Sequence, residues 1–188
     1  MKKFSCNEYA QTLSVILSET DWSSVEIFAD KLKSVIKTKN HLYICGNGGS
    51  AGNAMHLAND FLYGVSPNLA NALKVEALSA NSSVLTCLGN DLGYDSIFSR
   101  QLKVKAEKGD LLLVLSGSGN SSNIIKAIEE AKIKGMYTVG ILGFDGGKAK
   151  EILDMPIHFD INDMQISEDL QLIVGHMLMK LLSKIHYD

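Results

Sequence analysis

Five short segments with strand-like patterns, one of them the alternating segment Ala72–Leu78, are separated by longer segments with helical periodicity. Leu111–Leu115 holds no polar residue, which is typical of a strand buried on both faces of a parallel sheet. The pattern predicts an α/β fold, a three-layer αβα sandwich around a five-stranded parallel sheet of the doubly wound, flavodoxin-like type. The expected strands are His41–Cys45, Ala72–Leu78, Leu111–Leu115, Tyr137–Leu142 and Pro156–Phe159.

Apolar positions three and four residues apart predict helices around these strands. Two helices precede the first strand as a helical hairpin, and Ser23 with Glu26 gives the second helix a capping-box signal. Ser79 is expected to cap a short helix that ends at Cys87, before a turn-rich loop over residues 88–93. The expected helices are Phe4–Leu17, Val25–Ile36, Gly49–Phe61, Ser79–Cys87, Tyr94–Glu107, Asn123–Lys134, Lys148–Leu153 and Asp163–Ile185.

Glycine and small hydroxyl residues follow two of the strands. Residues 46–52 read GNGGSAG and residues 116–122 read SGSGNSS, while residues 143–147 form a weaker third loop of this kind. A strand, a Gly/Ser loop and a helix in this order direct backbone N–H groups and hydroxyls to one point beside a positive helix end. One such loop could be an ordinary strand-to-helix turn, but its repetition favours a phosphate site.

The residue types in these loops distinguish between classes of phosphate ligand. Gly46, Gly48 and Ala51 match the dinucleotide fingerprint, with Glu76 as its acidic residue, but Glu76 lies inside its expected strand and not after it. No Gly-Lys-Ser/Thr triplet follows either loop, so the Walker pattern is absent. The four serines of residues 116–122 suit a terminal phosphate monoester, which favours a sugar phosphate.

Length and charge narrow the range of functions. The 188 residues suit one domain, with residues 1–38 as the helical hairpin and residues 39–188 as the α/β core. The net charge of −3 is dispersed along the chain, which argues against nucleic-acid binding, and no segment suits a membrane span. Cys6, Cys45 and Cys87 have no paired spacing; Cys45 and Cys87 are expected to be reduced core thiols, which suits the cytoplasm.

Four separated motifs together resemble a known family. They are GNGGS at residues 46–50 with His56, Gly-Asn-Asp at 89–91, IFSR at 97–100 and the serine loop at 116–121. In this order they resemble the sugar isomerase (SIS) domain family, most closely its bacterial phosphoheptose isomerases, over nearly the whole chain. The resemblance implies a single SIS domain and a homo-oligomer, specifically a tetramer whose subunits share active sites.

The resemblance also implies which residues bind a sugar phosphate. The phosphate would be held by the serine loop, and the sugar by the first glycine loop together with the turn at residues 89–91. The implied substrate-binding residues are Asn47, Gly48, Gly49, Ser50, Asn90, Asp91, Ser116, Gly117, Ser118, Ser121 and Glu168.

Acidic and imidazole side chains on two expected helices form the remaining candidates. His56 and Asp60 lie four residues apart, and Glu168 and His176 lie eight apart, so each pair shares a helix face. By resemblance these four residues would hold one zinc ion per subunit, with Asp60 as the base and His176 as its acid partner. The family has Glu and Gln at the positions of Asp60 and Glu168. The Asp60 side chain is shorter than Glu by about 1.5 Å of reach.

Structural roles, without any part in a site, remain possible for both histidines. His56 could contact only its loop, and His176, beside Gly175 on an apolar face, could be a core histidine. The implied activity is conversion of sedoheptulose 7-phosphate to D-glycero-D-manno-heptose 7-phosphate through an enediol, supplying lipopolysaccharide or capsule. An isomerase of another sugar phosphate, or a non-catalytic SIS adaptor or sensor that binds a sugar phosphate, is the alternative.

Overall fold

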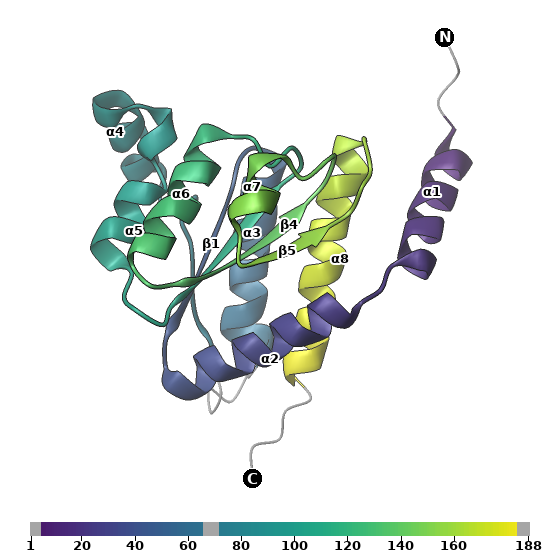
Figure 1. The fold of residues 1–188 in the computed structure, drawn as a ribbon, viewed down its shortest axis with the longest axis horizontal. Coiled ribbons are helices and arrows are strands. Elements are labelled where there is room, and N and C mark those ends of the chain that lie inside the picture. Colours follow the sequence, from purple (N-terminus) through teal and green to yellow (C-terminus); the bar gives the residue numbers. More distant parts are fainter. Residues whose placement is uncertain (1–4, 66–71, 184–188) are drawn as a thin grey trace.

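The computed structural model describes residues 5–65 and 72–183, which form a single parallel sheet with helices on both faces (Figure 1). The strand order is β2-β1-β3-β4-β5, and every neighbouring pair is parallel. This confirms the predicted fold class. The strands are β1 (His41–Gly46), β2 (Lys74–Ala77), β3 (Leu111–Ser116), β4 (Tyr137–Leu142) and β5 (Met155–His158).

The helices divide into two layers because alternate residues of the strands face opposite sides of the sheet. Helices α2, α3 and α8 cover one face, and α5, α6 and α7 cover the other. The helices are α1 (Cys6–Glu19), α2 (Ser23–Thr38), α3 (Gly49–Asn59), α4 (Ser82–Leu92), α5 (Ser99–Lys105), α6 (Ser122–Ile133), α7 (Gly147–Ile152) and α8 (Met164–Ser183), with a π-helical turn η1 (Asp60–Gly64) and a 3-10 turn η2 (Tyr94–Ser96).

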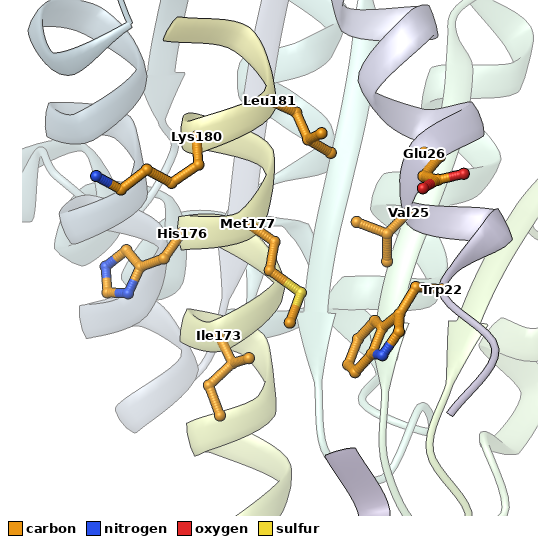
Figure 2. A pocket seen from close by; sticks show the side chains of 8 residues that line it. All are labelled: Trp22, Val25, Glu26, Ile173, His176, Met177, Lys180 and Leu181. Atoms are coloured by element: carbon orange, nitrogen blue, oxygen red, sulfur yellow. The ribbon is translucent and has the colours of Figure 1, made fainter. Parts of the chain in front are cut away.

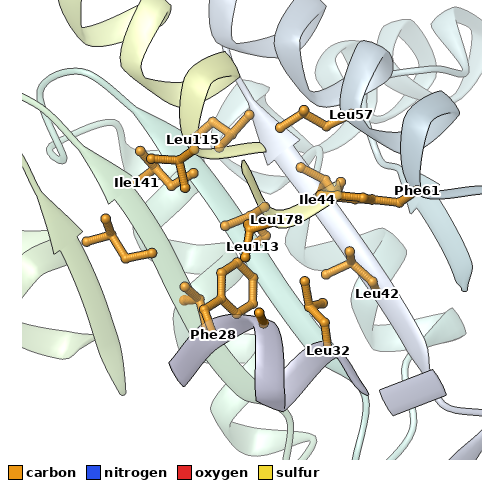
Figure 3. Packing of buried hydrophobic residues seen from close by; sticks show 14 of the residues in the cluster. Phe28, Leu32, Leu42, Ile44, Leu57, Phe61, Leu113, Leu115, Ile141 and Leu178 are labelled. Carbon is orange, nitrogen blue, oxygen red and sulfur yellow. The ribbon is translucent and has the colours of Figure 1, made fainter. Parts of the chain in front are cut away.

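The larger half of the core lies between the sheet and α2, α3 and α8. Figure 3 shows Phe28 and Leu32 of α2 packed against the sheet beside Leu113. Phe28 and Leu32 have no exposed surface, and burial of such side chains is the main stabilising contribution to a fold of this kind. The packing fixes α8 beside α3, and so positions the residues that these two helices carry.

Helices α1 and α4 differ from the other helices in having no buried residue. Helix α1 lies at the edge of the protein (Figure 1) and packs on the core only through partly buried side chains. Tyr9 joins it to α8 by donating a hydrogen bond to Asp169 Oδ2 at 2.6 Å. This contact raises the pKa of Tyr9 to about 12, because the Asp169 carboxylate accepts a hydrogen bond from the neutral phenol and its negative charge disfavours the phenolate. Within the described residues, no helix is long and apolar enough to cross a membrane.

Three local predictions were wrong. The α4 helix is capped by Asn81, whose side chain accepts from the Val84 N–H at 3.1 Å, and not by Ser79. The helix continues through the residues that were expected to form a turn-rich loop and ends at Leu92. Because α4 has no buried residue, Cys87 is exposed and is not a core thiol.

The N-terminal side of α2 and the segment after α4 also differ from the sequence-based expectation. The α2 cap position is Trp22, without a side-chain cap, and the Ser23 hydroxyl donates to Asp21 Oδ2 at 3.0 Å in place of forming a capping box. The expected helix over residues 94–107 is divided into η2 and α5. The expected starting residue Phe4 and end residue Ile185 lie outside the described residues.

Candidate functional site

A cavity of about 260 Å³ lies at the carboxyl ends of β1 and β3. This is the edge of a parallel sheet where ligands bind in doubly wound folds. The Gly/Ser loops after both strands meet there, which the sequence alone could only suggest. The lining residues are Asn47, Gly48, Gly49, Ser50, Leu115, Ser116, Gly117, Ser118, Ser121, Met164 and Glu168.

The serine loop presents hydroxyl groups at the start of α6. Ser116 Oγ accepts a hydrogen bond from the Gly119 N–H at 3.0 Å, and Ser118 Oγ accepts one from the Asn120 N–H at 3.3 Å. A hydroxyl that accepts in this way keeps its own O–H to donate. Ser121 is the α6 cap residue but makes no side-chain cap bond. Three hydroxyls beside a helix N-terminus are suited to phosphate oxygens.

The glycine loop forms the opposite wall of the cavity. Gly48 has φ +55°, a conformation that favours glycine, and α3 begins at the next residue without a side-chain cap. A Cβ atom on Gly49 would lie 2.6 Å from the carboxyl carbon of Glu168. Only glycine therefore lets the Glu168 carboxylate approach the first turn of α3, where the helix dipole favours negative charge.

Two imidazoles and a carboxylate converge where α3 and α8 lie side by side. His56 Nε2 and His176 Nε2 are 3.0 Å apart, and each lies 3.4 Å from Asp60 Oδ2. The two histidine side chains are about half exposed and Asp60 is 18% exposed. Neither histidine is a core residue. The trio is therefore open to a ligand from solvent.

The separations within this trio fit a divalent metal ion. Ligand atoms about 2.0–2.1 Å from a tetrahedral zinc ion are about 3.3 Å from one another, and the three observed separations are 3.0, 3.4 and 3.4 Å. Imidazole and carboxylate groups are also ordinary zinc ligands. Glu168 is not one of the three converging residues; its carboxylate lies beside Gly49 instead.

Close packing and buried polar contacts hold α3 against α8. Gly175 lies opposite Leu57, and a Cβ atom there would lie 3.0 Å or less from three carbons of that side chain. The Asn53 amide donates to Gln171 Oε1 at 3.0 Å, and Gln171 Nε2 donates to Ser50 Oγ at 3.1 Å. These contacts fix the relative positions of His56 and His176, which are the sequence neighbours of Leu57 and Gly175.

Relatives of known family share most of the length of this chain. Residues 6–143 match the family described as SIS domain. A phosphoheptose isomerase from a Nitratiruptor species is 38% identical over 149 residues, which are 79% of this chain and 79% of that protein. One from Aliarcobacter butzleri is 35% identical over 182 residues, covering 97% of this chain and 94% of that protein. The chain belongs to the SIS domain family.

Solved structures agree with this SIS assignment. Phosphoheptose isomerase GmhA from Neisseria gonorrhoeae superposes with a TM-score of 0.82 at 28% identity, covering 94% of this chain and 91% of that one. A phosphoheptose isomerase from Francisella tularensis superposes with a TM-score of 0.87 at 24% identity, covering 95% and 96%, and supports the fold alone. The resemblance inferred from the four sequence motifs is confirmed.

Two predicted substrate-binding residues of this SIS domain do not line the cavity. Asn90 and Asp91 lie near the end of the exposed helix α4, where the Asn90 amide donates to Asp91 Oδ1 at 2.8 Å. Asp91 Oδ2 lies 3.6 Å from the Cys87 thiol, and this hydrogen bond raises the pKa of the thiol. The proposed role of both residues in sugar binding stays a prediction.

Several polar residues of the SIS site were missed by sequence reasoning. Asn53, Gln171 and Asn123 hydrogen-bond to predicted site residues or across the helices that carry them. Gln171 and Asn123 are each 1% exposed. A buried amide needs hydrogen-bond partners within the protein. An amide residue on an otherwise apolar helix face was therefore the sequence feature that could have identified these positions.

A second, apolar cavity of about 560 Å³ adjoins the His56–Asp60–His176 trio, between α2 and α8. Figure 2 shows Met177 and Ile173 on α8 facing Trp22 and Val25, while the His176 ring points away from them. His176 therefore belongs to the trio and also lines an exposed apolar groove. Such grooves on soluble domains mark interaction surfaces.

Proposed function

We propose that this SIS domain is an aldose–ketose isomerase that converts sedoheptulose 7-phosphate to D-glycero-D-manno-heptose 7-phosphate. The observation that carries the proposal is the pairing of a serine-lined cavity with a trio of proton-transferring side chains, in a chain 35–38% identical to phosphoheptose isomerases. Supply of heptose for lipopolysaccharide or capsule is the corresponding pathway proposal.

In this proposal the serine loop binds the phosphate. The hydroxyls of Ser116, Ser118 and Ser121 donate to phosphate oxygens, and the first turn of α6 adds N–H groups and a favourable dipole. Glu168, on the opposite wall, accepts hydrogen bonds from sugar hydroxyls, because a carboxylate would repel the phosphate itself. The charge pattern thus orients the sugar with its phosphate toward α6.

Isomerisation moves one proton between adjacent carbons through an enediol, so it needs a base at carbon and an acid at oxygen. We assign the base to Asp60 and the acid to His176, whose Nε2 lies 3.4 Å from Asp60 Oδ2. Neutral histidine can donate a proton at one ring nitrogen and accept one at the other. His56 lies at the same distance from Asp60 and orients the carboxylate.

The same trio would hold a divalent cation, and we propose zinc, one ion per subunit. When bound, such an ion polarises the sugar carbonyl as a Lewis acid. His56, Asp60 and His176 are its proposed ligands, with Glu168 as the fourth. The Glu168 carboxylate must leave Gly49 to join them, because the structure places it outside the converging trio.

The experiment that tests this function is an NMR time course with sedoheptulose 7-phosphate in deuterated solvent with added zinc. We expect an aldose product and deuterium at the position of the transferred proton. His176→Ala should lower kcat at least 100-fold, the range of general acid–base contributions. His41→Gln is the matched control, since His41 stacks on Tyr43 at the opposite end of β1 and should retain activity.

Two other outcomes would point to the alternatives. Turnover of a pentose or hexose phosphate, without turnover of sedoheptulose 7-phosphate, would indicate an isomerase of another sugar phosphate. Tight sugar-phosphate binding without exchange or product, unchanged by Asp60→Glu, would indicate a non-catalytic adaptor or sensor. Either result would contradict the proposed reaction.

We also propose that the protein forms a homo-oligomer, and specifically the tetramer that the family resemblance implies. Helix α1 lies at the edge of the protein with no fully buried residue, while the apolar groove between α2 and α8 is open (Figures 1 and 2). A second copy would bury both surfaces. Light scattering after size exclusion should give four times 20.4 kDa, and a monomer at micromolar concentration would contradict the assembly. A cytoplasmic location stays a prediction from cysteine usage.

A further inference from the structure

Asn47 of the glycine loop is held by an unusually complete set of hydrogen bonds. Its Nδ2 donates to Asn123 Oδ1 at 2.9 Å, and Asn123 Nδ2 donates back to Asn47 Oδ1 at 2.8 Å. The hydroxyl of Tyr94 donates to the same oxygen at 3.0 Å. Asn47 Oδ1 therefore has two donors, and Nδ2 retains one N–H for a ligand in the cavity.

The three residues come from three different parts of the fold. Asn47 follows β1, Asn123 lies in the first turn of α6, and Tyr94 opens η2. Asn123 is 1% exposed, so its amide needs partners within the protein. An ion pair between Lys126 of α6 and Asp95 of η2 fastens the same two segments beside Tyr94.

Tyr94 has a different environment from Asn123. It is 61% exposed, so burial of its ring does not explain its position. Its hydroxyl is directed instead onto an oxygen of a cavity-lining residue. A solvent-accessible tyrosine whose polar end meets a binding residue is placed to orient that residue.

We infer that Asn123 and Tyr94 are positioning residues that hold the Asn47 amide in the orientation that binds the sugar phosphate. The inference rests on the proposed function and extends it to two residues outside the cavity lining. Neither residue is proposed to contact the reacting carbons; both act through Asn47. Their loss should weaken substrate binding and leave the proton-transfer step intact.

The test is a double-mutant cycle with steady-state kinetics. Tyr94→Phe should raise KM about fivefold, the change expected for one neutral hydrogen bond, with kcat within about twofold of wild type. Asn123→Ala, which removes the reciprocal pair, should raise KM about tenfold or more. In an Asn47→Ala background, Tyr94→Phe should have no further effect.

Matched controls separate positioning from a general loss of stability. Tyr43→Phe removes a buried hydroxyl that donates to the Lys105 carbonyl at 3.1 Å, and Asn40→Ala removes an amide that donates to Asp110 Oδ1 at 3.2 Å. Both lie at the other end of the sheet. They should lower the midpoint of urea unfolding without changing KM.

Two results would overturn the inference. One is an unchanged KM in Tyr94→Phe. The other is an increase in KM from Tyr94→Phe that is equally large in wild type and in Asn47→Ala. If Asn123→Ala fails to fold, the exposed Tyr94 position still gives the answer. If wild-type protein binds sedoheptulose 7-phosphate without turnover, the proposed function fails, and calorimetric Kd values for the same variants test the positioning role independently. Absence of wild-type binding would contradict both.

Discussion

Substitution of Gly175 by alanine tests whether the contact between α3 and α8 sets the geometry of the proposed metal site at His56, Asp60 and His176. A Cβ atom at this position would lie 3.0 Å or less from Cγ, Cδ1 and Cδ2 of Leu57. Leu57 has no exposed surface, so its side chain cannot turn outward. The two helices must separate, and His56 and His176 separate with them.

The expected size of the effect follows from two opposing contributions. Overpacking of a well-filled core costs about 1–3 kcal/mol. Alanine in place of glycine in a helix interior contributes about 1 kcal/mol in the opposite direction. We expect the free energy of unfolding to fall by about 1 kcal/mol. The affinity for zinc should fall 10- to 100-fold, as for changes in residues that support metal ligands.

Urea unfolding and chelator competition measure these two quantities. Gly52→Ala is the matched control, because it lies in α3 and a Cβ atom there would meet nothing within 4 Å. That variant should gain up to about 1 kcal/mol of stability and keep its zinc affinity. The reasoning is refuted if Gly175→Ala is stabilised like the control and binds zinc as tightly as wild type.

Three further predictions concern the fold. Burial acts to raise the pKa of Asp154, but hydrogen bonds from Thr138 together with the hydrogen bond and positive charge of Lys132 outweigh it and lower the pKa. Asp154→Asn should therefore lose about 1–2 kcal/mol at pH 7 by urea unfolding, and this difference should vanish as the pH falls from about 4 through the lowered pKa. Gly119→Ala should lose about 3 kcal/mol, since Gly119 has φ +64° and its Cβ would lie 2.6 Å from the Gly146 carbonyl carbon. Phe28→Ala, in the core, should lose about 3–5 kcal/mol, measured the same way.

The hydrophobic pattern was sufficient to predict the centre of the sheet because β1, β3 and β4 are short and almost wholly apolar. Tyr137–Leu142 was predicted with its observed bounds, and β3 extends only one residue beyond the predicted run. Burial on both faces leaves little choice for such segments. Helix α4 was predicted less well because it has no fully buried residue, and its Leu85 and Leu88 pack only partly against the core, so its hydrophobic pattern is weak.

The parts of the site that the sequence could not supply are contacts across long separations. His56 and His176 are 120 residues apart in the sequence, yet their Nε2 atoms are 3.0 Å apart. Helical spacing placed each one on a face but gave no information about which faces meet. The decisive contact involves Gly175, whose missing side chain leaves no mark in a hydrophobic pattern.

The shorter carboxylate at position 60 still reaches both imidazoles. Regular α-helical geometry in α3 ends at Asn59, and the chain continues as a π-helical turn from Asp60 to Gly64. Asp60 Oδ2 lies 3.4 Å from each imidazole, so binding of a metal does not require the longer side chain. In the proposed role of Asp60 as the base, the shorter side chain therefore affects proton transfer at carbon, where a displacement of about 1 Å can cost about 100-fold in rate. Asp60→Glu should accordingly change kcat much more than zinc affinity, and the opposite result would assign Asp60 to the metal alone.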